Sequence, residues 1–315
     1  MTLLTLWIVV PCFNEEEVLP ETASRLSALM KELMYENRIS GESRVCFVND
    51  GSADSTWEKI RSLHESDPLF AGLCLSRNRG HQNALLAGLM LARTHADAVI
   101  SMDADLQDDP GAVRAFLEQY ENGCDIVYGV RSSRASDSFF KRSSAESFYR
   151  LMKFLGAELV FNHADYRLMS RRALDALAEY EEVNLFLRGI APQLGFRSAC
   201  VEYERAERFA GKSKYPLKKM LSFAFDGVSS FSVRPLRAAL VLGGAAFAVS
   251  IVILIYCLIR HLCGKTVSGW TSLGVSIWAL GGLQLLMIGV VGEYVGKVYL
   301  ETKKRPRYII EETLL

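Results

Sequence analysis

Residues 97–110 read DAVISMDADLQDDP, an apolar run followed by four aspartates within seven residues. Carboxylates this close repel one another, so the cluster calls for a cation, a helix N-terminus or open solvent. Comparable junctions occur earlier, where PCFNEEE, NDGSADS and SRNRGHQN each follow a short apolar run. Between them lie segments with helical spacing of apolar residues, such as residues 19–33. This alternation predicts an α/β fold with a mainly parallel sheet covered by helices.

The expected elements follow from these patterns. Strands are predicted over residues 6–10, 44–48, 72–76, 97–102 and 125–130, and helices over 15–37, 51–65, 81–94 and 110–123. Pro110 suits the first turn of the last helix. Because ligands of open α/β sheets bind beyond the carboxyl ends of the strands, we expect the polar segments to form one composite site there.

The overall composition excludes several classes of protein. Lys and Arg together equal Asp and Glu at 36 each, so no global basic field indicates a nucleic-acid partner. The seven scattered cysteines form no CxxC pair and predict reduced thiols in a cytosolic compartment. The N-terminal apolar run lacks a basic region before it, which favours a first strand over a signal peptide.

Two long uncharged runs stand near the C-terminus, over residues 238–259 and 267–292. Each is long enough to cross a hydrocarbon core of about 30 Å as a helix, so we expect two membrane helices. Gly243-Gly244 and Gly281-Gly282 would permit close helix packing. Basic residues are more numerous outside the two runs than in the connecting segment 260–266, which predicts cytoplasmic termini and a cytoplasmic large domain.

The segment just before the first run, residues 214–235, mixes aromatic, leucine and basic residues. This mixture favours an interfacial amphipathic helix lying on the bilayer, with an ordinary core helix as the alternative. The predicted organisation is a catalytic domain over residues 1–213, this interfacial segment, membrane helices over 236–296 and a cytoplasmic tail over 297–315.

The acidic loop suggests a metal site. Neither GxGxxG nor GxxxxGK[ST] is present, which excludes a standard dinucleotide-binding or P-loop enzyme. Asp103 and Asp105 lie two residues apart, so in an extended segment they could point the same way, and Gln107 could add an amide oxygen. Such hard oxygen ligands suit Mg²⁺ or Mn²⁺ bridging to substrate phosphates. The alternative is solvated surface or helix capping, and capping is our interpretation of Asp108 and Asp109.

Several motifs in order carry a family resemblance: VVPCFNEEEVL, VNDGSADST, SRNRGHQNALLAGL, MDADLQDDP, ERFAGKSKY and GEYVGKVYLETKKRP. Together they resemble family 2 glycosyltransferases of the polyprenyl-phosphate type, similar to bactoprenol-phosphate glucosyltransferases and, more distantly, dolichol-phosphate mannose synthase. The resemblance covers nearly the whole chain, including the two C-terminal uncharged runs.

The resemblance implies a nucleotide-sugar-binding fold of the GT-A type. Residues implied to bind the nucleotide-sugar are Pro11, Phe13, Glu15, Asp50, Ala104, Arg208, Lys212 and Ser213. Within this set, Asp50 would touch the base, and the three residues of the late basic motif would close over the diphosphate. Asp103 and Asp105 would hold the nucleotide and its metal, with Gln107 as a further ligand. Asn49 departs from the family, because many relatives carry an aspartate there.

The acceptor side requires cations, because both substrates would be anionic. Segment 129–144 supplies Arg131, Arg134, Lys141 and Arg142, and the resemblance favours Arg131 and Arg142 for the acceptor phosphate. A solvated basic loop is the alternative.

Asp165 matches a family acidic position near the sugar, where it could orient hydroxyls or act as a base. The alternative is a structural hydrogen bond to Arg167. His81 and His163 are interpreted as ordinary hydrogen-bonded loop residues.

The predicted function is inverting, metal-dependent transfer of one sugar from a nucleotide donor, expected to be UDP-linked, to undecaprenyl phosphate. It would take place at the cytoplasmic face of a bacterial inner membrane, for modification of cell-envelope glycans. The expected partners are the donor, the lipid acceptor and the membrane, with no nucleic acid. The small-residue faces of the two runs permit a homo-oligomer. A processive polysaccharide synthase is one alternative, but its typical QxxRW motif and additional spans are lacking. A non-catalytic nucleotide-sugar-binding scaffold is the other.

Overall fold

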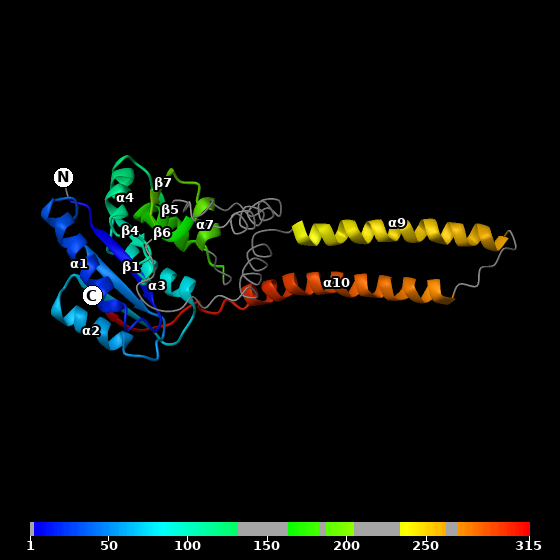
Figure 1. The fold of residues 1–315 in the computed structure, drawn as a ribbon, viewed down its shortest axis with the longest axis horizontal. Helices are drawn as coiled ribbons and strands as arrows, with labels where there is room; N and C mark the ends of the chain where they lie inside the picture. Colours follow the sequence, from blue (N-terminus) through cyan, green and yellow to red (C-terminus); the bar gives the residue numbers. More distant parts are fainter. Residues whose placement is uncertain (1–2, 132–162, 183–186, 205–233, 263–269) are drawn as a thin grey trace. The chain divides into compact units, whose positions relative to one another are not determined.

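A computed structural model describes residues 3–131, 163–182, 187–204, 234–262 and 270–315 (Figure 1). These residues fall into two compact units. The first contains the sheet, its helices and the C-terminal residues 305–315, and the second contains the two long helices. Arg142, Arg208, Lys212, Ser213 and the predicted interfacial segment 214–235 lie outside the described residues, apart from the first turn of the first long helix.

One eight-stranded sheet organises the first unit, with strand order β7-β5-β6-β4-β1-β2-β3-β8. The strands are β1 Leu6–Cys12, β2 Arg44–Asn49, β3 Phe70–Leu75, β4 Ala98–Ser101, β5 Ile126–Arg131, β6 His163–Ser170, β7 Ser198–Tyr203 and β8 Ile310–Leu314. The core β4-β1-β2-β3 is parallel throughout. This arrangement confirms the predicted α/β class and mainly parallel sheet.

Helices cover both faces of this sheet (Figure 1). They are α1 Leu19–Tyr35, α2 Thr56–Ser66, α3 His81–Arg93, α4 Ala112–Glu121, α6 Arg171–Ala178 and α7 Leu187–Gln193. Side chains alternate along β1, so Leu6, Ile8 and Val10 pack with α1 and α4 in one hydrophobic core. On the other face Gly88 of α3 faces Val9, where an added Cβ would lie 2.4 Å from a Val9 methyl. Close packing of α3 on β1 therefore requires glycine at this position.

Three strands were not predicted from the sequence. β6 runs antiparallel between β4 and β5, and β7 extends the sheet parallel to β5. β8 pairs antiparallel with β3 and forms the other edge of the sheet. The stretch interpreted as a cytoplasmic tail therefore contributes a strand to the first unit.

The second unit consists of α9 Arg234–Leu262 and α10 Trp270–Thr302. Helix α9 contains the first uncharged run and α10 contains residues 270–292 of the second, and Gly243 of α9 lies against Met287 of α10. Within the described residues, one stretch is long and apolar enough to cross a membrane, Leu280–Thr302, with a mean hydropathy of 1.3. Two long helices are thus present, whereas the expectation of two membrane spans is not confirmed.

Candidate active site

The loops that follow β1, β2 and β3 are joined by hydrogen bonds at the carboxyl edge of the sheet. The Ser52 hydroxyl accepts the Asn14 amide N–H at 3.0 Å, and the Thr56 hydroxyl accepts the Glu15 amide N–H at 3.0 Å. Pro11 lies in β1 opposite Val48, and Phe13 beyond the strand end is 46% exposed. The predicted nucleotide residues Pro11, Phe13 and Glu15 are therefore placed along the end of β1 and the loop that follows it.

Asp50 ties the next two loops together. Its buried carboxylate accepts the amide N–H groups of Arg79 at 2.7 Å and Gly80 at 2.9 Å. Burial raises the pKa of Asp50, and the two amide hydrogen bonds oppose that shift. Gly51 has φ +62°, and an added Cβ would lie 2.5 Å from the Arg77 backbone, so the turn requires glycine. The structure thus brings Asp50 to the site edge and holds the loop after β3 with it.

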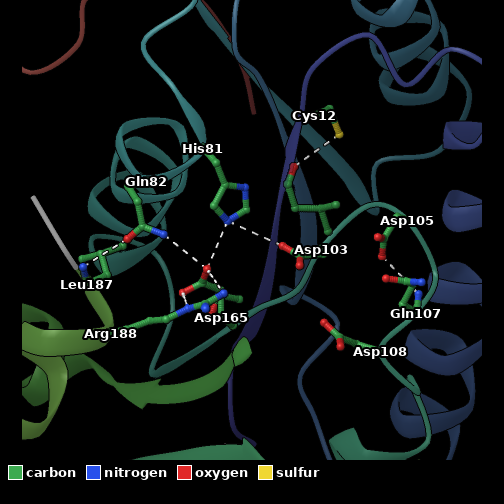
Figure 2. A network of polar contacts seen from close by, with 12 residues as sticks. Cys12, His81, Gln82, Asp103, Asp105, Gln107, Asp108, Asp165, Leu187 and Arg188 are labelled. Carbon is green, nitrogen blue, oxygen red and sulfur yellow. Dashed lines mark hydrogen bonds and ion pairs between the residues drawn. The ribbon is translucent and has the colours of Figure 1, made fainter. Parts of the chain in front are cut away.

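The acidic motif after β4 is a turn rather than the extended segment we expected. Leu106 has φ +57°, and both Leu106 and Ala104 are buried. The Thr22 hydroxyl donates to the Ala104 carbonyl at 2.9 Å, which fixes the turn against α1. Asp105 accepts the amide N–H of Gln107 at 3.2 Å, while Asp103 faces His81 (Figure 2). The argument that alternation aligns Asp103 with Asp105 is therefore wrong, because apolar burial closes the turn.

His81 bridges two carboxylates, which the sequence interpretation missed (Figure 2). Its Nε2 lies 3.5 Å from Asp103 Oδ1 and 3.4 Å from Asp165 Oδ2. Burial would lower the pKa of His81, but the hydrogen bond to Asp165 and the charge of Asp103 outweigh it and raise that pKa. A histidine at the start of α3, directly after the polar loop that follows β3, was the available signal.

Asp103 lies among several negative charges. Burial is the largest cause that raises the pKa of Asp103 to about 6, and the carboxylates of Asp165, Asp108 and Asp105 contribute to this rise against the opposing effect of His81. The motif thus places several carboxylates close to one another.

Asp165 on β6 is buried and contacts several donors. Arg167 Nη2 lies 2.7 Å from its Oδ1, and Arg188 contacts both carboxylate oxygens, at 3.1 and 2.9 Å. Gln82 Nε2 donates to Oδ2 at 3.2 Å. Burial alone would raise the pKa of Asp165, but His81, Arg188 and Arg167 hold it well below its usual range. The hydrogen bond between Asp165 and Arg167, which the sequence analysis gave as the alternative, is therefore present. The catalytic role of Asp165 remains a prediction.

Asp108 is not a helix cap. Its carboxylate is 1% exposed, accepts the Tyr203 hydroxyl at 2.5 Å and lies 3.6 Å from Arg131 Nη2. Asp109 does shape the turn, because it accepts the Gly111 amide N–H at 2.9 Å. Helix α4 begins at Ala112 rather than at Pro110. Arg131 is thus joined to the acidic motif through Asp108, a link that the sequence did not reveal.

The donor set fits a divalent cation that also contacts substrate. Among the residues that the structure describes, no group of three or more His, Cys, Asp or Glu side chains is arranged to hold a metal ion. Mg²⁺ is usually held by one or two carboxylates together with waters and substrate phosphates, so a preformed cage is not required. Burial and three neighbouring carboxylates raise the pKa of Asp103, and a bound cation would favour its ionised form. The assignment of Asp103, Asp105 and Gln107 to such a cation remains a prediction.

A family model supplies the decisive comparison: residues 7–178 match Glycosyl transferase family 2. The chain belongs to glycosyl transferase family 2. The matched residues run from β1 to the end of α6 and include every site residue described above except Arg188 and Tyr203. The protein is therefore a glycosyltransferase, as the sequence motifs predicted.

Full-length relatives agree with this assignment. The chain is 55% identical, over 97% of its length and 91% of the relative's, to the Bacillus subtilis (strain 168) protein named uncharacterized glycosyltransferase YkoT. It is 40% identical, over 96% and 97%, to the prophage bactoprenol glucosyl transferase homolog of Escherichia coli (strain K12). It is 41% identical, over 96% and 98%, to the bactoprenol glucosyl transferase of Shigella phage SfX.

A solved structure supports the fold. The mannosyl-3-phosphoglycerate synthase of Rubrobacter xylanophilus is similar, with a TM-score of 0.50 and 15% identity over 75% of this chain and 74% of that one. At this identity the likeness concerns the fold, which is of the predicted GT-A kind.

Proposed function

We propose that this family 2 glycosyltransferase transfers one sugar from a nucleotide-sugar, UDP-linked, to a polyprenyl phosphate such as undecaprenyl phosphate. The observation that carries the proposal is the match, over 96% of the chain, to proteins named bactoprenol glucosyl transferase. Bactoprenol is a polyprenyl alcohol, and these matches extend through both long C-terminal helices. The product would be a lipid-linked sugar for modification of cell-envelope glycans.

The reaction needs orientation and charge balance more than a strong base. A phosphate oxygen of the acceptor, already ionised near neutral pH, attacks the anomeric carbon while the bond to the nucleotide diphosphate breaks. In-line attack inverts the anomeric configuration. A bound Mg²⁺ or Mn²⁺ supplies Lewis-acid stabilisation of the leaving diphosphate. Asp103 and Asp105 would hold this metal ion. Phe13, Glu15 and Asp50 would line the nucleotide-binding part of the site.

The acceptor side follows from the remaining cations. Arg131 lies at the end of β5, beside the acidic motif, and would contact the acceptor phosphate. Arg142 is assigned to the same role. Arg208, Lys212 and Ser213 would close over the donor diphosphate. A lipid acceptor also requires proximity to a bilayer, for which we propose α9 and α10 as two spans and residues 214–235 as an interfacial segment. The catalytic unit and both termini would then be cytoplasmic, and a homo-oligomer remains compatible with this arrangement.

A donor screen tests the proposal. The full chain, purified in detergent with Mn²⁺ or Mg²⁺, is incubated with UDP-sugars and a polyprenyl phosphate, and products are identified by mass. We expect one sugar per lipid, and loss of turnover by at least about 100-fold in Asp105→Ala. Asp109→Asn, which removes a charge from the same loop and keeps an acceptor for the Gly111 amide N–H, serves as the matched control. A polymeric product would instead indicate a processive synthase, and nucleotide-sugar binding without any transfer would indicate a scaffold.

The membrane assignment has its own test. We expect the full chain to remain in the membrane fraction after alkaline carbonate washing and to be released by detergent. Release by carbonate alone would contradict the two proposed spans.

A further inference from the structure

We propose that Glu16 is a positioning residue for the donor nucleotide, because it holds the loop after β1 on the N-terminal end of α2. This inference rests on the proposed function, in which Phe13 and Glu15 of the same loop line the nucleotide-binding part of the site. Glu16 follows Glu15 directly in the chain, yet it is not among the residues predicted from sequence to bind the nucleotide.

The backbone of this loop is tied to the segment that leads into α2. Three successive amide N–H groups, at residues 14–16, donate to side chains of residues 52–56. The third of them belongs to Glu16, whose amide nitrogen lies 3.3 Å from Asp54 Oδ2. Burial would raise the pKa of Asp54, but hydrogen bonds from the Thr56 hydroxyl and amide and from the Glu16 amide lower it. Asp54 is therefore an ionised acceptor that holds the two segments together.

The side chain of Glu16 makes the return contact. Its Oε2 accepts the amide N–H of Ser55 at 3.2 Å and the Ser55 hydroxyl at 2.6 Å. Lys59 Nζ, one turn further along α2, donates to the Glu16 carbonyl oxygen at 2.7 Å. Ser55 is the N-cap of α2, and its own side chain caps no amide of the helix. The Glu16 carboxylate thus lies at the positive end of the helix dipole, where a negative charge is favourable.

Burial does little to hold the loop, so these hydrogen bonds fix its conformation. Phe13 is 46% exposed, and Asn14 and Glu17 are exposed as well. Asn14 has φ +53°, in the left-handed region, and its Oδ1 accepts the Ala53 amide N–H at 2.9 Å. Without the contacts of Glu16, ordering the loop falls to the nucleotide when it binds, which lowers affinity. The predicted effect is therefore on the donor and not on the lipid acceptor.

The test uses the full chain in detergent and measures the affinity for UDP with Mn²⁺, together with KM for the UDP-sugar and the polyprenyl phosphate that the wild type uses. Glu16→Ala removes the carboxylate, whereas Glu16→Gln keeps a side-chain oxygen that can accept from Ser55. Glu17→Ala is the matched control, because it removes a neighbouring exposed carboxylate from the same loop. Ser55→Ala, alone and combined with Glu16→Ala, tests whether the two residues act through their hydrogen bond. Thermal melts of every variant report on stability.

We expect Glu16→Ala to weaken UDP binding and to raise KM for the UDP-sugar by more than about threefold, with kcat and KM for the lipid within about twofold of wild type. Glu16→Gln should recover most of the affinity, Glu17→Ala should match the wild type, and Glu16→Ala should cost less in the Ser55→Ala background. A UDP affinity within about threefold of wild type in Glu16→Ala would overturn the proposal. Equal loss of donor affinity, lipid affinity and thermal stability would overturn it as well, because it would indicate a structural role only.

Failure of the proposed function gives a different pattern. If the wild-type chain binds UDP but transfers sugar to no polyprenyl phosphate, the proposed acceptor is wrong, and the UDP affinities of the variants still decide on Glu16. If the wild type binds another nucleoside diphosphate instead of UDP, the same variants are compared with that nucleotide. A wild-type chain that binds no nucleoside diphosphate contradicts the donor site itself, and this inference with it.

Discussion

The hydroxyl of Tyr203 on β7 donates a 2.5 Å hydrogen bond to the buried carboxylate of Asp108 in the acidic motif. The two residues are 95 positions apart in the chain. Arg131 completes the contact, with Nε donating to the Tyr203 hydroxyl at 3.3 Å and Nη2 lying 3.6 Å from Asp108. A strand outside the parallel core thus supports the motif that we assign to the donor.

The first prediction concerns this hydrogen bond. Tyr203→Phe leaves a buried carboxylate with one donor fewer, which costs about 1–3 kcal/mol. For a unit of this size we expect a fall in Tm of about 3–8 °C. Tyr35→Phe, at a side chain that is 89% exposed, should leave Tm unchanged. An unchanged Tm in Tyr203→Phe would show that this hydrogen bond does not stabilise the folded unit.

The second prediction separates two roles of Arg131. If Arg131 contacts the acceptor phosphate, Arg131→Gln should raise the KM for polyprenyl phosphate by about 10-fold and leave UDP affinity close to wild type. The contact with Asp108 predicts a modest fall in Tm as well. Steady-state kinetics with each substrate varied in turn, beside thermal melts, provides the measurement. A lower Tm with an unchanged KM would restrict Arg131 to a structural role.

The third prediction concerns pH and Asp103. The folded pKa of about 6 lies above the ordinary value of 3.8, so the stability that Asp103 contributes is present below about pH 4 and lost as pH rises through 6. In EDTA, Asp103→Asn should therefore raise Tm by about 2–4 °C at pH 7.5, equivalent to about 1 kcal/mol, and leave it unchanged at pH 4. Melts at both pH values decide this. A variant that is stabilised at pH 4 as well would show that ionisation of Asp103 is not the cause.

The parallel part of the fold could be predicted because its signals are local. Each strand of the β4-β1-β2-β3 core is a short apolar run followed at once by a polar loop, and each helix between them shows apolar spacing. The positions of Asp50 and Asp103 at the carboxyl edge of the sheet follow from this alternation of strands and helices. The geometry within the acidic motif did not follow, because it depends on where Ala104 and Leu106 are buried.

The remaining strands depend on contacts between distant residues. β6 contains the buried Asp165 and Arg167, whose charges make the segment look exposed in sequence. The two residues pair with one another on β6, which lies between β4 and β5. Arg188, a further partner of Asp165, lies in a short helix 21 positions beyond Arg167. The pairing of Asp165 with Arg167 could be weighed from their spacing, but no periodicity connects Asp165 with His81, Gln82 or Arg188, so those contacts could only be found in three dimensions.

The last prediction concerns β8, which covers the edge of β3. Its Glu312 accepts hydrogen bonds from Trp57 Nε1 at 3.1 Å and Arg61 Nη2 at 2.7 Å, while the Leu314 side chain lies beside Gly72 of β3. Exposed ion pairs contribute little to stability, whereas an uncovered strand edge promotes association. We therefore expect deletion of residues 309–315 to lower Tm by several degrees and to cause aggregation in light scattering, since β3 loses its neighbour.

Two point variants locate the source of that stability. Leu314→Ala, which removes apolar contact from a half-buried side chain, should cost about 1 kcal/mol and lower Tm by about 2–4 °C. Glu312→Ala should change Tm less than Leu314→Ala does, because its partners remain accessible to water. The reverse order would show that the ion pair with Arg61, rather than strand pairing and apolar contact, holds the C-terminal strand on the catalytic unit.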